Sequence, residues 1–467
     1  TPHAFAQDDT PAQSVPAAES LNAPAVDDVA LPADSAPGSP LLMIDWSGLL
    51  RLRGQWIEGG TLGNGVSGLP SPLSLNDVKD SVNGAGDRLA QLDLRLRLSP
   101  ALVLGSYARI DSLVDVAGRT VMGSDLRTDT TDGRMLGFEG NGPVRDAMAV
   151  RRMWATFDVF GLATFEVGRM GDHFGLGILR NDGRDGRADW QSDVDRLRVA
   201  VELFGLQLRV MRDNRASLPM LSKGPGAQDP IYPVADSTDV VRWTAEVEQV
   251  KPADAPGLRW AFAIGYQDQA VGLALVHGED PAGKLSSDCI ARGTCVQLVT
   301  RDAVLVQPQA FVSWRAHRPW GGISLAAEGA LSVGTIGNSD ALASTDTSKT
   351  IIAGAAAGRG DLWWGRQRLS LDAGYASGEG EGGFGVLDRQ NLTATTPAGE
   401  VHRSFLTGLP MHRGYLVDGL LYREVIGAVA NSAFVRPAWR FSVIEGHRDG
   451  GLTLEFGAVL AMAARIG

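Results

Sequence analysis

The stretch Gln91-Leu92-Asp93-Leu94-Arg95-Leu96-Arg97-Leu98 places leucine at every second position and a polar or charged residue at each position between. The same alternation appears in residues 50–53, 195–203 and 241–248. Successive side chains of a β-strand point to opposite faces, so a period of two predicts strands with one apolar and one hydrated face. A helix would need apolar residues at spacings of three and four, and no long stretch has them.

Period-two patterns continue through most of the chain after residue 40 and predict sixteen strands. They are residues 44–57, 88–98, 101–112, 148–159, 162–171, 195–204, 206–213, 239–249, 257–267, 303–315, 321–333, 350–358, 364–377, 416–427, 432–444 and 451–463. Short links such as Ser99-Pro100, Phe160-Gly161 and Gly205 alternate with long polar segments. The long segments are 58–87, 113–147, 172–194, 214–238, 268–302 and 378–415.

Tight turns at one end and long loops at the other are typical of an outer-membrane barrel. Strands of about 9–11 residues are long enough to cross the hydrocarbon layer at a tilt, and lipid offers no partner to an unpaired strand edge. The sequence therefore predicts an all-β fold, a transmembrane antiparallel up-and-down β-barrel of about sixteen strands over residues 41–467. The long loops are expected outside the cell and the short turns in the periplasm. A soluble propeller or β-helix would show a repeat of fixed period, and none is found.

The composition restricts the class of protein further. The chain has 467 residues, of which 44% are hydrophobic and 21% charged, and its formal net charge is −11. The sequence contains no run of about 18 apolar residues, so it predicts no transmembrane helix. The acidic balance argues against nucleic acid as a partner.

The N-terminal 40 residues differ in composition from the rest. Ala4-Phe5-Ala6 followed by Gln7 matches the small-residue cleavage pattern of a secretory signal peptide, so residues 1–6 are expected to be its end. Residues 7–40 are rich in Pro, Ala and Asp, which predicts a disordered periplasmic tail.

Two cysteines lie close together, at Cys289 and Cys295, within one long polar segment. In an exported protein this spacing favours a small loop disulfide. A metal site would need further ligands, and no histidine lies nearby.

If the apolar face of each strand meets lipid, the charged face lines the lumen. The residues predicted to line it are Arg51, Arg53, Asp93, Arg95, Arg97, Arg109, Asp111, Arg152, Glu166, Arg196, Arg198, Glu202, Arg242, Glu246, Glu328, Asp372 and Arg440. Arginines outnumber carboxylates in this set. Two interpretations stay open: fixed positive charge that favours anions, or arginines that pair with neighbouring carboxylates and brace a wide barrel.

The sequence carries little that points to catalysis or metal binding. After the tail, the histidines fall in proposed loops, turns or strand edges, and none alternates with an inward serine, so the sequence predicts no enzyme. Asp182, Asp185 and Asp189 carry oxygen ligands suited to Ca²⁺, but their spacing is not that of an EF-hand, and a solvated acidic loop is favoured. We therefore expect no metal and no cofactor.

Several motifs give the chain a family resemblance. They are Gly168-Arg169-Met170-Gly171-Asp172-His173-Phe174-Gly175-Leu176-Gly177, Asn181-Asp182-Gly183, Gly374-Tyr375-Ala376-Ser377-Gly378, Tyr415-Leu416-Val417-Asp418 with Arg423-Glu424, and Asn431 with Arg436-Pro437. On these the chain resembles Gram-negative outer-membrane porins, and more specifically alginate-export-type barrels and a porin-like family of myxobacteria. The resemblance implies a bacterial outer-membrane location and contact with lipid and lipopolysaccharide.

Two features depart from that family. Alginate-type barrels have eighteen strands, and barrels of this class usually end on an aromatic residue, whereas this chain ends Ala464-Arg465-Ile466-Gly467. The departure leads to the expectation that two strands are missing at the C-terminus.

Two functions remain from the sequence. The first is a porin-like channel for passive or facilitated diffusion of small hydrophilic solutes, with a mild preference for anions or acidic saccharides. The second is a structural or adhesive surface barrel whose lumen is plugged by its own loops. Segments 113–147 and 378–415 are long enough to fold inward. The oligomeric state stays open.

Overall fold

The computed structural model describes residues 42–58, 88–105, 107–123, 149–188, 190–215, 240–252, 255–274, 299–336, 348–378, 405–418, 422, 428–445 and 451–464. Seventeen strand segments in these ranges form one sheet. They are β1 (Leu42–Glu58), β2 (Arg88–Leu104), β3 (Ala108–Gly123), β4 (Ala149–Val159), β5 (Ala163–Gly171), β6 (Asp193–Leu203), β7 (Leu206–Arg215), β8 (Val240–Gln249), β9 (Gly257–Ala274), β10 (Val299–Arg318), β11 (Gly321–Ile336), β12 (Lys349–Trp364), β13 (Gln367–Ala376), β14 (Phe405–Leu406), β15 (Ser432–Glu445), β16 (Gly451–Gly457) and β17 (Leu460–Ala463).

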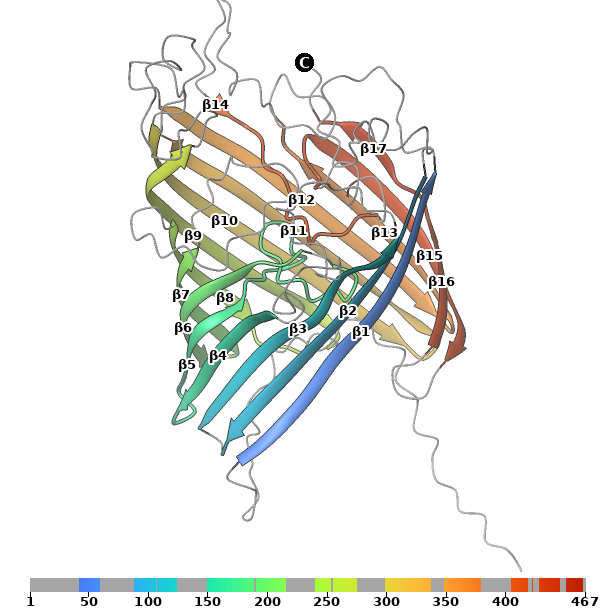
Figure 1. Cartoon of the computed structure of the whole chain (residues 1–467), viewed down its shortest axis with the longest axis horizontal. Helices are drawn as coiled ribbons and strands as arrows, with labels where there is room; N and C mark the ends of the chain where they lie inside the picture. Colours follow the sequence, from blue (N-terminus) through green and yellow to red (C-terminus); the bar gives the residue numbers. More distant parts are fainter. Residues whose placement is uncertain are drawn as a thin grey trace, which may run out of the picture.

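The strands pair up and down in chain order. Each strand from β1 to β13 is antiparallel to the next. β13 then pairs with β15, and β15 pairs with both β16 and β17, which are two parts of one edge. Only the two-residue β14 is parallel to its partner, β12. The sheet curves around an interior, and segments of the chain outside the strands run through this interior (Figure 1).

The predicted all-β, antiparallel architecture of about sixteen strands is thus confirmed: sixteen of the seventeen described segments are antiparallel. Among the described residues no backbone pairing joins β1 to β16 or β17, so closure of the barrel stays a prediction. No described helix is long and apolar enough to span a membrane.

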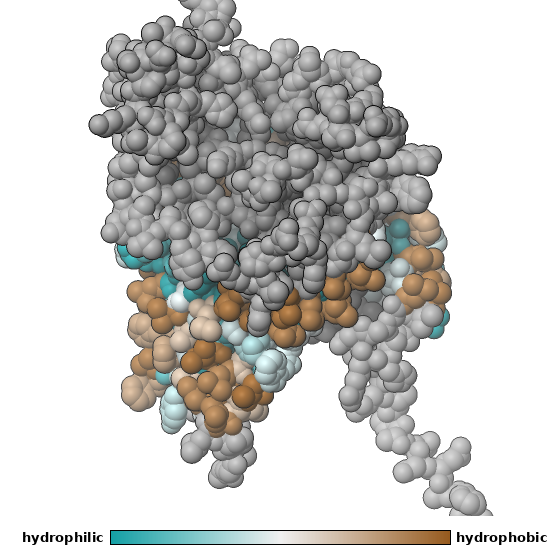
Figure 2. All heavy atoms as spheres, viewed as in Figure 1, coloured by the Kyte–Doolittle hydropathy of each residue, from teal (hydrophilic) through white to brown (hydrophobic). Residues whose placement is uncertain are grey.

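The two faces of the strands differ as the alternation predicts. In β8, Trp243 is 50% exposed, whereas its neighbour Arg242 is 2% exposed. Figure 2 shows apolar side chains gathered on the outer surface of the described strands. Apolar outside and charged inside is the reverse of a soluble protein and is the pattern of a membrane barrel.

One predicted turn, one predicted strand start and one predicted strand are wrong. Ser99 and Pro100 do not form a turn but lie within β2, opposite Ser47 and Trp46 of β1; β2 continues to Leu104 and β3 begins at Ala108. Proline lacks only its own N–H, and its carbonyl still accepts the hydroxyl of Ser112 at 3.1 Å.

The strand predicted at 364–377 begins at Gln367, after a turn at Gly365 and Arg366, and residues 359–364 extend β12. The described part of predicted strand 416–427 is not strand. Val417 and Tyr422 are buried instead in an apolar cluster inside the barrel.

Two turns at the short-turn end share one geometry. Phe160 and Gly161 have φ of 56° and 66°, and Phe204 and Gly205 have φ of 53° and 74°. Positive φ at both central residues is the type I′ turn, whose twist matches that of a two-residue hairpin. These links are two of those predicted from the sequence.

Candidate functional site

A segment that follows β5 folds into the barrel. Residues 172–192, the first infolded segment, return to the wall where β6 begins, and the N–H of Asp172 donates to the carbonyl of Ser192 at 3.0 Å. The segment forms no strand of the sheet, yet Ile178 is fully buried and Arg180 is 2% exposed. The sequence predicted this segment as an outer loop, and that prediction is wrong. The segment folds inward because charged side chains of the wall form ion pairs with its own charged residues.

A buried ion network fixes the base of the first infolded segment. Three arginines alternate with three carboxylates, and each side chain is 6% exposed or less. The members are Arg180, Arg196, Arg242, Asp172, Asp213 and Glu246. Arg196 contacts Asp172 at 2.7 Å and Asp213 at 2.5 Å. Because the charges balance and each arginine has carboxylate partners, burial of the network is tolerated.

Arginines from the wall also hold the backbone of the segment. Arg51 of β1 donates to the carbonyl of Gly186 at 3.0 Å, and Arg95 of β2 donates to that of Ala188 at 2.5 Å. Arg152 of β4 donates to the carbonyl of Asp182. These hydrogen bonds fix the position of the segment's backbone against β1, β2 and β4.

Near the tip of the segment, acidic residues pair with arginines. Asp182 lies 2.7 Å from Arg184, and Asp185 lies 2.8 Å from Arg187. Burial opposes ionisation of Asp182, but Arg184, His173 and Arg152 outweigh it and lower its pKa well below the usual range. The pKa of Asp185 is likewise lowered by Arg187 against the effect of burial. Both carboxylates are therefore engaged by arginine, which disfavours the Ca²⁺ alternative; Asp189 lies outside the described residues.

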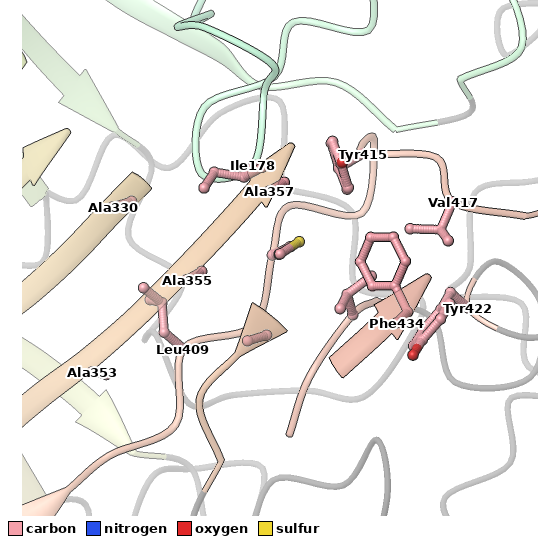
Figure 3. Close-up of a cluster of buried hydrophobic side chains, with 13 residues drawn as sticks. Ile178, Ala330, Ala353, Ala355, Ala357, Leu409, Tyr415, Val417, Tyr422 and Phe434 are labelled. Carbon is pink, nitrogen blue, oxygen red and sulfur yellow. The ribbon is translucent and has the colours of Figure 1, made fainter. Parts of the chain in front are cut away.

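A second infolded segment, residues 407–418, rests on the first. The N–H of His412 donates to the carbonyl of Ile178 at 2.6 Å. The guanidinium of Arg413 lies 4.9 Å from the ring centre of Trp190, at the distance of a cation–π contact. Both segments join β12 and β15 in one buried apolar cluster inside the barrel (Figure 3). The sequence predicted that 378–415 could fold inward. Phe405 and Leu406 pair with β12 as β14, and residues 407–415 fold inward.

One serine and one histidine meet between the two segments, which the sequence did not predict. Nε2 of His412 lies 2.8 Å from Oγ of Ser192, and Nδ1 accepts the N–H of Gly414 at 2.9 Å. With Nδ1 occupied as acceptor, the neutral ring carries its proton on Nε2 and donates it to the serine. A general base would need the opposite arrangement, with a third group orienting Nδ1–H. The contact therefore joins two segments and lacks the geometry of a nucleophile pair.

The structure places most of the predicted lumen residues on the inner, charged face. Buried there are Arg95, Arg97, Arg109, Asp111, Arg152, Glu166, Arg196, Arg242, Glu246, Glu328 and Asp372. Partly buried are Arg51, Arg53, Arg198 and Arg440. Glu202 is exposed beside the turn after β6. The backbone of Asp93 pairs with that of Arg53, and its side chain is not among those described.

Six carboxylates that pair with inward arginines were missed by the sequence prediction. They are Asp115, Asp172, Asp182, Asp193, Asp213 and Asp361. Asp213 shares the alternation of Arg209 on β7, so its position was readable, whereas Asp172 and Asp182 lie on the infolded segment. With these partners, the interpretation that arginines brace the wall holds for much of the predicted set.

In two ion pairs between β12 and β13, the arginine is the member that reaches water. Arg359 of β12 is 38% exposed and its partner Asp372 is 3% exposed. Arg368 of β13 is 28% exposed and its partner Asp361 is 5% exposed. The water-facing surface of these pairs is therefore guanidinium, although the pairs themselves are neutral.

No protein-family model matches the sequence, and no curated protein matches it. Similar solved structures are OmpT, an outer membrane protein of Vibrio cholerae (8% identity, 91% of this chain and 89% of that chain, TM-score 0.40), Pseudomonas aeruginosa OccK8 (10%, 90% and 94%, 0.40) and Salmonella typhi OmpF (9%, 90% and 97%, 0.36). These are similarities at low sequence identity and low TM-score. The architecture that the structure shows is one antiparallel up-and-down β-sheet with an apolar outer face and a charged inner face. The finer resemblance to alginate-export barrels stays a prediction.

Proposed function

We propose that the chain is an outer-membrane channel for small hydrophilic solutes, narrowed by the two infolded segments and biased toward anions. The observation that carries the proposal is the exposure order in the wall pairs, where Arg359 and Arg368 face water and their carboxylates are buried behind them. An ion in the lumen meets the guanidinium first. The preference for anions therefore arises at these two arginines and needs no large excess of arginine over carboxylate in the lumen.

Acidic saccharides suit such a surface. A guanidinium has five N–H donors in a planar fork, and one carboxylate partner occupies at most two of them. The remaining donors can bind a carboxylate and the hydroxyls beside it. This supports the preference for anions or acidic sugars without naming one solute.

The test is the reversal potential of single channels in a planar bilayer under a potassium chloride gradient. We expect chloride to be more permeant than potassium. Arg359→Gln with Arg368→Gln should lower the chloride preference, because a unit charge about 10 Å from an ion in water contributes about 0.4 kcal/mol, roughly a factor of two. Asp372 keeps Arg436 at 2.9 Å and Asp361 keeps Ser370 at 2.6 Å, so both carboxylates retain a partner.

The matched control is Arg169→Gln. Arg169 belongs to β5, alternates in step with the exposed Phe165 and Val167, and pairs with Asp195, which is 54% exposed. It lies on the outer face and should leave the selectivity unchanged. A wild-type channel that prefers cations would contradict the anion bias.

A plugged structural or adhesive barrel is the second candidate. It is favoured by the contact of the two infolded segments inside the barrel, through His412 and Trp190. Folded protein that inserts in the bilayer and shows no conductance would select this function over the channel.

A further inference from the structure

The first turn of the first infolded segment forms an anion-binding concavity. Gly175 and Gly177 have φ of 55° and 83°, and they alternate with Leu176 and Ile178. Such alternation turns successive backbone N–H groups toward one point, which makes a nest for a negative group. The N–H of Gly177 also closes the turn by donating to the carbonyl of Phe174 at 2.9 Å.

The carboxylate of Glu328 occupies this nest. Its Oε2 accepts the N–H of Leu176 at 2.5 Å and that of Ile178 at 3.4 Å. The Glu328 side chain comes from β11, which lies six strand pairings beyond β5, where the segment begins. The contact therefore bridges two distant parts of the wall across the interior.

Packing around the nest leaves little freedom. Phe174 packs against Ala261, Ala263 and Phe311 of β9 and β10. A Cβ added at Gly175 would lie 2.8 Å from Oε2 of Glu328 and 3.0 Å from the Phe311 ring. Glycine is thus required here by both backbone conformation and space.

The described hydrogen-bond partners of the Glu328 carboxyl group are backbone N–H groups. Within the described residues, no ion pair engages Glu328, and the side chain is 2% exposed. It cannot touch a solute in the lumen. Its hydrogen bonds to the segment are those to the nest.

We infer that Glu328 is a positioning residue, a latch that fixes the first infolded segment across the lumen and so sets the width of the channel. The inference rests on the proposed channel function. The buried ion network anchors the segment to β6, β7 and β8, and Glu328 anchors its first turn to β11. Loss of the Glu328 contact should leave the base attached and loosen the turn.

The test compares Glu328→Ala and Glu328→Gln in the full chain. In planar bilayers, Glu328→Ala should show a mean conductance about twofold higher and larger current fluctuations, because the freed turn moves within the lumen. Glu328→Gln, which keeps an acceptor oxygen but not the charge, should lie between this variant and the wild type. Ser332→Ala is the matched control, since Ser332 lies on the same face of β11, is buried, and bonds to Gln307.

A second readout does not depend on conductance. Trypsin cleavage after Arg184 or Arg187, mapped by mass spectrometry on folded protein in detergent, reports release of the segment. We expect cleavage about tenfold faster in Glu328→Ala, the factor that about 1.4 kcal/mol gives. Gly175→Ala, which disturbs the nest from the other side, should behave in the same way and replaces Glu328→Ala if that variant does not fold.

The outcomes separate the two proposals. A wild type without conductance refutes the channel, while the cleavage rates still decide the latch. The proposed role of Glu328 is overturned if Glu328→Ala folds and shows the conductance, current noise and cleavage rate of the wild type. It is also overturned if Ser332→Ala is cleaved as fast as Glu328→Ala.

Discussion

Arg180 of the first infolded segment forms an ion pair with Glu246 of β8, and the two side chains are only 2% and 6% exposed. Arg180 also contacts Asp172 at 2.8 Å. Moving the segment away from the wall would leave buried charge without a partner, which costs several kcal/mol. The pair thus makes the segment part of the folded structure of the barrel.

Arg180→Met should therefore destabilise the protein strongly. Glu246 and Asp172 lose a buried partner, and breaking one side of such a pair typically costs about 3–5 kcal/mol. The double variant Arg180→Met with Glu246→Leu should recover part of this loss, because it removes a buried carboxylate whose remaining described partner is Arg209 at 3.5 Å. Thermal unfolding in detergent, followed by circular dichroism, measures both. Equal stability of Arg180→Met and wild type would contradict the role of the pair.

The strands were predictable because lipid imposes a simple rule on them. Apolar and polar residues alternate over 91–98 because one face of the strand meets lipid and the other faces the interior. This pattern predicts the strand without knowledge of any distant contact. The edges were less certain: at Ser99-Pro100 the general preference of proline for turns was overridden by pairing with β1.

The interior was not predictable in the same way. Residues 416–418 alternate like a strand, but burial of Val417 and Tyr422 in the interior cluster decided their position. The inward fold of residues 172–192 depends on Arg51, Arg95 and Glu328, which are far away in the sequence. Local sequence patterns carry no information on such contacts. The excess of arginine over carboxylate on the inner face was therefore predicted without the carboxylates of the infolded segment.

Gly205→Ala should destabilise the hairpin between β6 and β7 by about 1 kcal/mol. Gly205 has φ of 74° and nothing within 4 Å of an added Cβ, so the loss comes from backbone conformation and not from a clash. Gly329→Ala is the control, because Gly329 also has open space but lacks a positive φ. Urea unfolding of protein refolded into vesicles gives both values. A loss at Gly329 as large as that at Gly205 would refute the conformational explanation.

Cys289 and Cys295 lie outside the described residues, so their disulfide stays a prediction from the sequence. The ring is short, and its stabilisation should be modest, roughly 2–3 kcal/mol at most. Mass analysis of purified protein under non-reducing conditions should show both cysteines oxidised, and unreactive toward an alkylating reagent until reduction. Two free thiols in freshly exported protein would refute the pair.

The contribution of Asp182 to stability should depend on pH in a defined direction. Burial opposes its ionisation, but Arg184, His173 and Arg152 lower its pKa far below the ordinary value of 3.8. A group whose pKa is lowered by folding stabilises the folded state above its unfolded pKa, and this stabilisation is lost as the pH falls through the folded value. The melting temperatures of wild type and Asp182→Asn should therefore differ by a constant amount from neutral pH down to about pH 4 and converge below it. Asp195→Asn is the control, because its pair with Arg169 is on the outer face and 54% exposed at the carboxylate, where an ion pair contributes little. A wild-type advantage over Asp182→Asn that disappears already between pH 7 and 5 would show that the arginines do not hold this carboxylate as described.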